Sequence, residues 1–175
     1  MRHTEPRRVI QLGLNFLDLH RYDALGFLPH NQVGLWSDNA EIYENHPSKQ
    51  ADAKYFNQLR REYHHNGIYF GGVAFKYQKP VSDFAKVAEM AVPYVDVVTT
   101  SGIKTGHQAD LQKVVEMREA IGNHPLAIAS GITPENVSQY MDYADCFLVA
   151  TGVSHPDTDE LDPRRVFRLA RLLSA

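Results

Sequence analysis

Short apolar segments alternate with amphipathic segments along the chain from Gly67 to its C-terminus. The apolar segments are rich in β-branched and aromatic residues, which is typical of buried strands. The amphipathic segments carry apolar residues at helical spacing. The expected strands cover residues 67–75, 94–100, 125–131 and 146–152, and the expected helices cover residues 81–92, 109–122, 133–144 and 161–173.

This order predicts four consecutive strand–helix units. Parallel strands that are joined by right-handed helical crossovers form either an open doubly wound sheet or a closed (β/α) barrel. In both architectures, ligands bind where the carboxyl ends of the strands meet. A functional site is therefore expected in the loops that follow the strands.

The first third of the chain can supply two further units. Strands are expected over 7–15 and 31–38, and helices over 16–27 and 50–67. A complete (β/α)8 barrel usually takes about 250 residues, and this chain is shorter by about two units. The sequence thus predicts an α/β fold of the (β/α)8 TIM-barrel type, incomplete, as a single domain over 1–175 that lacks the first βα units. Because open edges of a sheet invite association, a homo-oligomer is expected, with aggregation or burial of the edges by the N-terminal arm as the alternatives.

Several helix ends carry recognisable caps. Thr133 before Pro134 and Asp162 before Pro163 predict N-caps, with proline at the favoured first helical position. Gly122 predicts a left-handed C-cap.

The composition excludes several classes of protein. The chain has 22% charged residues and a formal net charge of -3. No basic run is interleaved with aromatic residues, so nucleic acid is not an expected partner. Neither a membrane-spanning apolar run nor the apolar region of a signal peptide is found. The lone Cys146 excludes an intramolecular disulfide and agrees with a reducing cytosol, so a cytoplasmic protein that is not integral to a membrane is expected.

Two similar turns follow the last two expected strands. Ser130 and Gly131 form the first, and Thr151 and Gly152 form the second. Glycine lets the backbone approach an anion, and the amides at a following helix start can bind it. These four residues are predicted to bind a phosphate group, with tight structural turns as the alternative.

The loop after the expected strand 94–100 has the same character. Gly102, Lys104 and Thr105 lie in the segment "SGIKTGHQ", which combines two glycines with hydroxyls and a lysine. Lys104 can bind a phosphate or a carboxylate as a point charge. The alternative is an exposed loop lysine.

Two charged residues at strand ends are candidates for catalysis. Lys76 follows the expected strand 67–75, and a lysine that is desolvated in the mouth of a barrel can act as a base or form a Schiff base. The alternative is a lysine that extends to solvent. Asp38, and near it Glu41, close the expected strand 31–38 and are candidates for general acid/base work or hydroxyl binding. A turn that Asn39 forms is the competing explanation.

Other chemistries find no support in the sequence. His64 and His65 are adjacent, so they would point in different directions on a helix, and no His-x-x-x-His pair or cysteine pair is present; no metal site is predicted. No Gly-x-Ser-x-Gly elbow or dinucleotide- or ATP-binding glycine motif appears, so no cofactor is predicted.

Three segments together resemble the C-terminal half of the BtpA family, which is associated with photosystem I biogenesis. They read "VDVVTTSGIKTGHQADLQKV", "PLAIASGITPENVSQYMDYADCFLVATGVS" and "ELDPRRVFRLARLL". The segments "VGLWSDNAEI" and "GVAFKYQKPV" resemble the strand-four and strand-five segments of that family. The resemblance covers residues from about Gln32 to the C-terminus and, at its widest, from Val9.

The resemblance implies a TIM barrel of the ribulose-phosphate-binding type with its phosphate site at the two turns. The residues carried over to the phosphate site are Gly102, Thr105, Ser130, Gly131, Thr151 and Gly152. Asp38 and Lys76 match polar positions on strands four and five. The family tends to have an aspartate and histidines around the strand-five lysine, where this chain has Gly72, Ala74 and Tyr77. A proton-transfer step of the relatives would then be absent here.

Two functions remain open at this point. The first is an enzyme, an isomerase, lyase or transferase, that acts on a phosphosugar or a nucleotide derivative. The second is a non-catalytic protein that binds a phosphorylated ligand or a partner and serves as an assembly or stability factor.

Overall fold

Six strands form one parallel sheet in the computed structural model, which describes residues 12–17, 19–29, 33–45, 50–158 and 160–174. Each strand pairs with the one that precedes it in the chain, so the order is β1-β2-β3-β4-β5-β6. The strands are β1 (Gly13–Asn15), β2 (Gly34–Ser37), β3 (Tyr69–Gly72), β4 (Val97–Ser101), β5 (Leu126–Ala129) and β6 (Cys146–Leu148).

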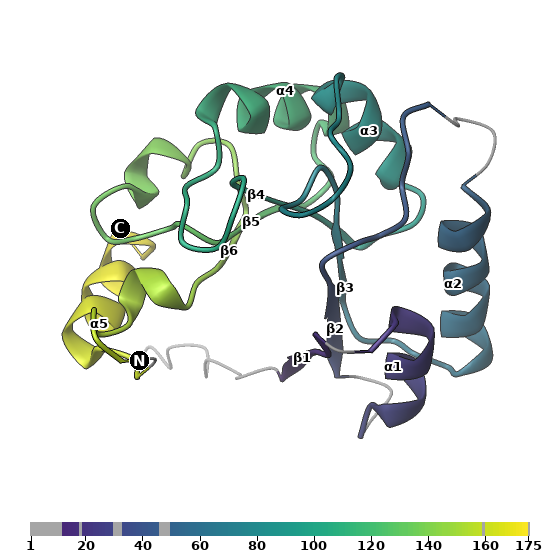
Figure 1. Cartoon of the computed structure of the whole chain (residues 1–175), viewed down its shortest axis with the longest axis horizontal. Helices are drawn as coiled ribbons and strands as arrows, with labels where there is room; N and C mark the ends of the chain where they lie inside the picture. The colour runs from purple at the N-terminus through teal and green to yellow at the C-terminus, as the bar shows by residue number, and fades with distance from the viewer. Residues whose placement is uncertain (1–11, 18, 30–32, 46–49, 159, 175) are drawn as a thin grey trace, which may run out of the picture.

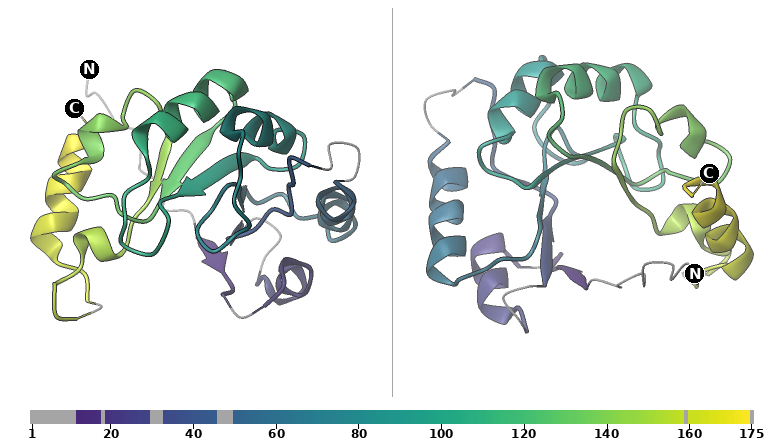
Figure 2. Two further views of the ribbon diagram at one scale, coloured as in Figure 1. Left: turned by 45° about the horizontal axis from the view of Figure 1, so that its top comes forward. Right: turned by 180° about the vertical axis from the view of Figure 1, so that it is seen from behind.

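Helices connect the strands and lie on the outer side of the curved sheet (Figures 1 and 2). They are α1 (Arg21–Phe27), α2 (Ala51–Glu62), α3 (Phe84–Ala91), α4 (Leu111–Ile121) and α5 (Pro163–Leu172), with short 3-10 helices η1 (Val137–Gln139) and η2 (Thr151–Val153). The six parallel strands with outer helices confirm the predicted α/β fold, part of a (β/α) barrel. None of the helices in the described ranges is long and apolar enough to cross a membrane.

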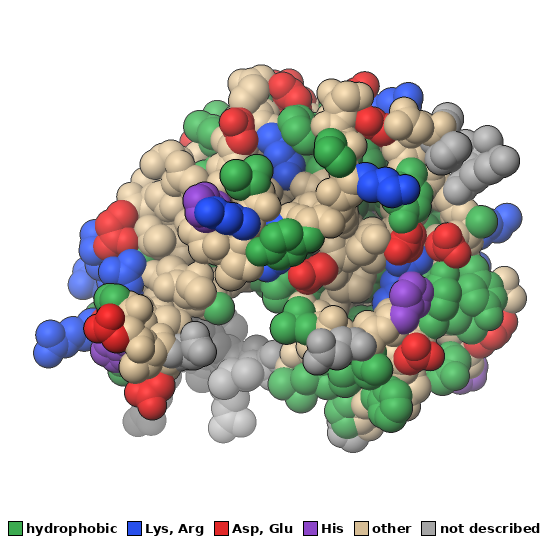
Figure 3. All heavy atoms as spheres, in the orientation of Figure 1, with side chains coloured by type: hydrophobic (Ala, Val, Ile, Leu, Met, Phe, Trp, Pro, Cys, Tyr) green, Lys and Arg blue, Asp and Glu red, His purple; other side chains and the backbone are tan. Residues whose placement is uncertain are grey.

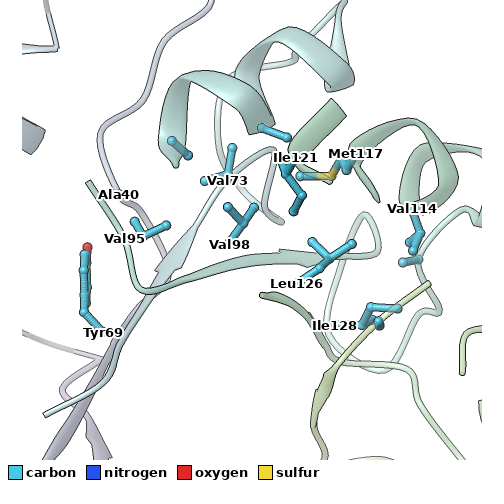
Figure 4. Packing of buried hydrophobic residues seen from close by; sticks show 14 of the residues in the cluster. Ala40, Tyr69, Val73, Val95, Val98, Val114, Met117, Ile121, Leu126 and Ile128 are labelled. Carbon is cyan, nitrogen blue, oxygen red and sulfur yellow. The ribbon is translucent and has the colours of Figure 1, made fainter. Parts of the chain in front are cut away.

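The core lies between the sheet and the helices α3 and α4 (Figure 4). Val98, Leu126 and Ile128 extend from the strands, and Val114 and Met117 extend from α4 to meet them; all five are fully buried. Burial of each such side chain contributes about 1.5–3 kcal/mol relative to an exposed one. This packing fixes the positions of β3, β4 and β5, whose carboxyl ends carry most of the predicted site.

The predicted helix over 133–144 is wrong. The segment contains only η1 and turns, in which most main-chain hydrogen bonds run three residues back, as from Asn136 to Thr133 and from Tyr140 to Val137. The side chain of Asn136 competes with helical bonding, because its Oδ1 accepts from the N–H of Thr133 and its Nδ2 donates to the carbonyl of Gly131. Thr133 therefore caps no α-helix.

Other predicted boundaries are closer to the structure. The side chain of Asp162 caps α5 by accepting from the N–H of Arg164, and Gly122 ends α4 with φ of 58°. The helix expected over 16–27 begins only at Arg21. Residues 7–11, 18, 31 and 32 of the expected elements lie outside the described residues.

Candidate functional site

Three neighbouring strands bring one lysine and two hydroxyl groups together. Lys76 lies in the loop after β3, Thr105 in the loop after β4, and Ser130 directly follows β5. The Nζ atom of Lys76 lies 3.3 Å from Oγ1 of Thr105 and 3.4 Å from Oγ of Ser130. Because the strands are parallel, their carboxyl ends share one edge of the sheet, and this places the three side chains side by side. We name Lys76, Thr105 and Ser130 the lysine–hydroxyl cluster.

The charge of Lys76 is not balanced by a neighbouring acid. Within the described ranges, no carboxylate forms an ion pair with Lys76. The residue is half-buried, and its Nζ lies 5.6 Å from the centre of the Phe75 ring. Its main-chain N–H donates to Oγ of Ser101 at 2.8 Å. A partly desolvated ammonium beside hydroxyl groups favours an anion as its partner.

Asp38 and Lys76 line the same pocket of about 750 Å³, which we name the Asp38 pocket. Oδ1 of Asp38 accepts a hydrogen bond from Nδ2 of Asn15 at 3.2 Å. The amide of Gln78 donates to the main-chain oxygens of Asp38 and Gly72, at 2.7 and 3.1 Å. These bonds tie the end of β2 to the loop after β3, so the two predicted catalytic residues share one cavity.

Asn39 forms the turn that was the competing explanation for this segment. Its Oδ1 accepts from the N–H of Glu41 at 2.9 Å, and its Nδ2 donates to Oε1 of Glu41 at 2.8 Å. The Tyr43 hydroxyl donates to the other carboxylate oxygen of Glu41. The carboxylate of Glu41 is thus held by its own turn, and Asp38, not Glu41, lines the Asp38 pocket together with Lys76.

A second pocket of about 770 Å³ lies on the other side of Lys76, between the loops after β3 and β4; we name it the Phe84 pocket. Lys113 of α4 lines it, and the structure shows a role for this residue that the sequence analysis missed. Its Nζ donates to the main-chain oxygens of Ala74 and, at 2.9 Å, Ser101. Burial lowers the pKa of Lys113 to about 8. The signal for it was a lysine on the apolar face of an amphipathic helix, next to Val114.

The glycines of the predicted phosphate turns are explained by packing between loops. A Cβ atom at Gly131 would overlap the backbone of His107 and Gln108, and one at Gly102 would overlap the same two residues. A Cβ atom at Gly152 would overlap the carbonyl of Ile132. The tight-turn alternative therefore accounts for these glycines, and the polar side chains rather than the glycines form the centre of the candidate site.

Neither turn leads directly into an α-helix, so the expected α-helix start does not stand at either one. The turn at Ser130 leads to η1, and Thr151 itself lies in η2. Thr151 is close to the loop of the cluster, because a Cβ atom at Gly106 would lie 4.0 Å from its Oγ1. Lys104 is exposed, and in the described part of the chain no hydrogen bond or ion pair joins it to the cluster.

Strained backbone gathers in the same loops. Ala74, Tyr77 and Ser130 have φ angles of 46°, 63° and 69°, in the left-handed region that non-glycine residues rarely adopt. Such conformations cluster at functional sites, where the surrounding structure holds them. Hydrogen bonds from Thr105 lower the pKa of the exposed Tyr77 phenol, and the charges of Lys76 and Lys104 act in the same direction.

The BtpA family model matches residues 51–175, which include the lysine–hydroxyl cluster and α4. The chain belongs to the BtpA family. Uncharacterized proteins of Pyrococcus horikoshii and Pyrococcus abyssi are each 29% identical to this BtpA-family chain over 82 residues, or 46% of its length. The match covers 31% of the length of each relative.

Solved structures similar to this BtpA-family chain include two phosphoribosylanthranilate isomerases. The Thermus thermophilus structure is 14% identical with a TM-score of 0.52, over 94% of this chain and 88% of that one. Monomers generated from the dimeric Thermotoga maritima protein are 19% identical with a TM-score of 0.50, over 93% and 86% of the two chains. At these identities the likeness concerns the fold.

Gly72 and Ala74, close to Lys76 in the chain, each have a structural role in this BtpA-family chain. A Cβ atom at Gly72 would overlap the backbone of Asp38, so no acidic side chain fits there. Ala74 holds its left-handed conformation with a carbonyl that is bonded to Thr100 and Lys113. Among the described residues, no group of three or more His, Cys, Asp or Glu side chains could hold a metal ion.

Proposed function

We propose that the chain binds a small phosphorylated ligand at the lysine–hydroxyl cluster and acts on it with Asp38. One observation carries the proposal: the Lys76 ammonium meets the hydroxyls of Thr105 and Ser130 from two other loops, with no ion-pair partner among the described residues. A phosphate would accept from the ammonium and from both hydroxyls, and charge-assisted hydrogen bonds of this kind are about twice as strong as neutral ones.

The remaining predicted residues have separate parts in this proposal. Thr151 lies beside the Thr105 loop and adds a hydroxyl at the rim. Lys104 is exposed at the entrance and attracts anions at longer range. Gly102, Gly131 and Gly152 let the three loops pack closely, which holds the cluster in place.

The chemical step is assigned to the Asp38 pocket. A ligand anchored at Lys76 extends along this pocket toward Asp38, whose carboxylate can take a proton from it and return it elsewhere. Lys76 stabilises negative charge that develops on the ligand. This agrees with an isomerase, lyase or transferase that acts on a phosphosugar or a nucleotide derivative. The two isomerases of similar fold are named for a phosphoribosyl compound, which supports a phosphosugar derivative as the class of ligand.

A non-catalytic role is the second candidate. Gly72 leaves no room for an acidic side chain beside Lys76. Proton transfer would therefore depend on Asp38, and without a part for Asp38 in catalysis the site would only bind. A chain in which Asp38 only holds the ligand would serve as a ligand- or partner-binding assembly or stability factor.

A ligand screen followed by an activity assay tests both candidates. We expect ribose 5-phosphate or a nucleoside monophosphate to raise the melting temperature, since a ligand at 100 times its Kd adds about 2.7 kcal/mol of stability. Asp38→Asn should keep this shift and abolish turnover of the compound that binds. Binding without turnover in the wild-type chain would favour the non-catalytic role, and no shift with any phosphorylated compound would contradict the proposed site.

A further inference from the structure

Lys113 joins the ends of two strands. Its Nζ donates to the carbonyl of Ala74 in the loop after β3 and to the carbonyl of Ser101, the last residue of β4. The side chain is buried between the Phe84 ring, 5.4 Å from Nζ, and the sheet. A buried ammonium needs hydrogen-bond partners that a methionine of similar length would not need, so packing alone does not account for a lysine at this position.

Both carbonyl groups belong to residues that fix Lys76. Ser101 accepts the main-chain N–H of Lys76 on its Oγ at 2.8 Å. Ala74 stands two positions before Lys76 in the left-handed conformation, and its carbonyl also accepts from Oγ1 of Thr100 at 3.3 Å. Lys113 thus holds the backbone of both segments that the hydrogen bond from the Lys76 N–H to Ser101 Oγ joins, at Ala74 in one and at Ser101 in the other.

We infer that Lys113 is a positioning residue that turns Lys76 toward Thr105 and Ser130. Without the bond to Ala74, that residue would lose a partner that keeps φ at 46°, and the loop that carries Lys76 could relax. The Lys76 ammonium would then leave the two hydroxyls. This inference rests on the proposed function, because it assigns to Lys113 the orientation of the proposed phosphate ligand.

Two measurements on Lys113→Met test the inference. The first is amide hydrogen exchange of Lys76, with the amide of Val98 as the reference, since Val98 donates to Pro125 in the core and reports general opening. The second is calorimetric titration with inorganic phosphate. Lys54→Met, which removes an exposed lysine of α2, is the control. Lys113→Gln, one bond shorter and uncharged, replaces Lys113→Met if that variant does not fold.

We expect the exchange of Lys76 to rise at least tenfold more than that of Val98. Phosphate affinity should fall about tenfold, the lower end of the effect that is found when partners that orient metal ligands are removed. Equal acceleration of both amides, or unchanged exchange at Lys76, would overturn the positioning role. Failure of the wild-type chain to bind phosphate would count against the proposed function alone, because the exchange experiment uses no ligand.

Discussion

The Nζ atom of Lys76 lies 3.4 Å from the hydroxyl oxygen of Ser130, although Ser130 stands 54 positions later in the chain. Between them lie two helices and the strands β4 and β5, and the loop after β4 carries Thr105. The contact exists because β3, β4 and β5 are parallel neighbours. The same topology sets the rest of the site, since Asp38 follows β2 on the other side of Lys76.

Each hydroxyl of the lysine–hydroxyl cluster is expected to contribute to phosphate binding. Ser130→Ala and Thr105→Val each remove one hydrogen-bond donor to a charged ligand, which is worth about 1 kcal/mol or more, so Kd should rise about fivefold or more. Calorimetric titration with inorganic phosphate measures this change. Ser138→Ala, at an exposed position of η1, is the control. An unchanged Kd in both cluster variants would place the phosphate elsewhere.

Gly131 is expected to be essential for stability. Gly131→Ala places a Cβ atom on the backbone of His107 and Gln108 at a φ of 70°, so we expect a loss of about 2 kcal/mol or more. Urea unfolding measures it. The matched control is Gly26→Ala in α1, where a Cβ meets nothing within 4 Å and should stabilise the helix by about 0.5–1 kcal/mol. Equal effects of the two variants would contradict the packing explanation.

The sequence predicted the strands and the end of the sheet at which the candidate site residues come together. Buried parallel strands leave runs of β-branched and aromatic residues, so all six were visible, and parallel order alone puts Lys76, Thr105 and Ser130 at one edge. The N-cap at Asp162 was predictable because an aspartate directly before a proline is typical of the start of a helix.

Other features depended on contacts between distant segments. The helix expected at 133–144 is replaced by turns because Asn136 bonds to Thr133, Gly131 and Gln108, and helical spacing does not reveal such bonds. A phosphate-binding turn and a tight structural turn both call for glycine, so the sequence does not distinguish them. The packing of one loop on another, which the structure shows, accounts for these glycines. Lys113 looked like an ordinary helix lysine, because its two carbonyl partners come from other elements.

Stability should depend on pH through Lys113. Burial lowers the pKa of Lys113 from 10.5 to about 8 in the folded chain, so between these values the unfolded chain binds more protons. The free energy of unfolding therefore gains up to about 3 kcal/mol from this group as pH rises through that range, and loses it as pH falls through about 8. The free energy of unfolding of wild type minus that of Lys113→Met, measured with urea, should therefore rise from pH 7 to pH 10. A difference that is independent of pH would contradict the lowered pKa.

Self-association is expected at the β1 side of the sheet. Leu17 and Phe27 are 78% and 66% exposed, and hydrophobic side chains gather around α1 on the face that Figure 3 shows. The strand β1 is also an edge of the described sheet. Light scattering should find an oligomer that Leu17→Asp with Phe27→Glu converts to a monomer. A wild-type chain that is a monodisperse monomer would contradict the prediction.

The central claim is that Lys76 anchors a phosphate group, and calorimetric titration of the wild type and Lys76→Met with inorganic phosphate tests it most directly. Lys54→Met again controls for the loss of one positive charge. We predict measurable binding by wild type and Lys54→Met, and a Kd at least tenfold higher for Lys76→Met, because the ammonium supplies a charge-assisted bond of about 1.5–3 kcal/mol. Equal affinities in a folded Lys76→Met would contradict the assignment of the site.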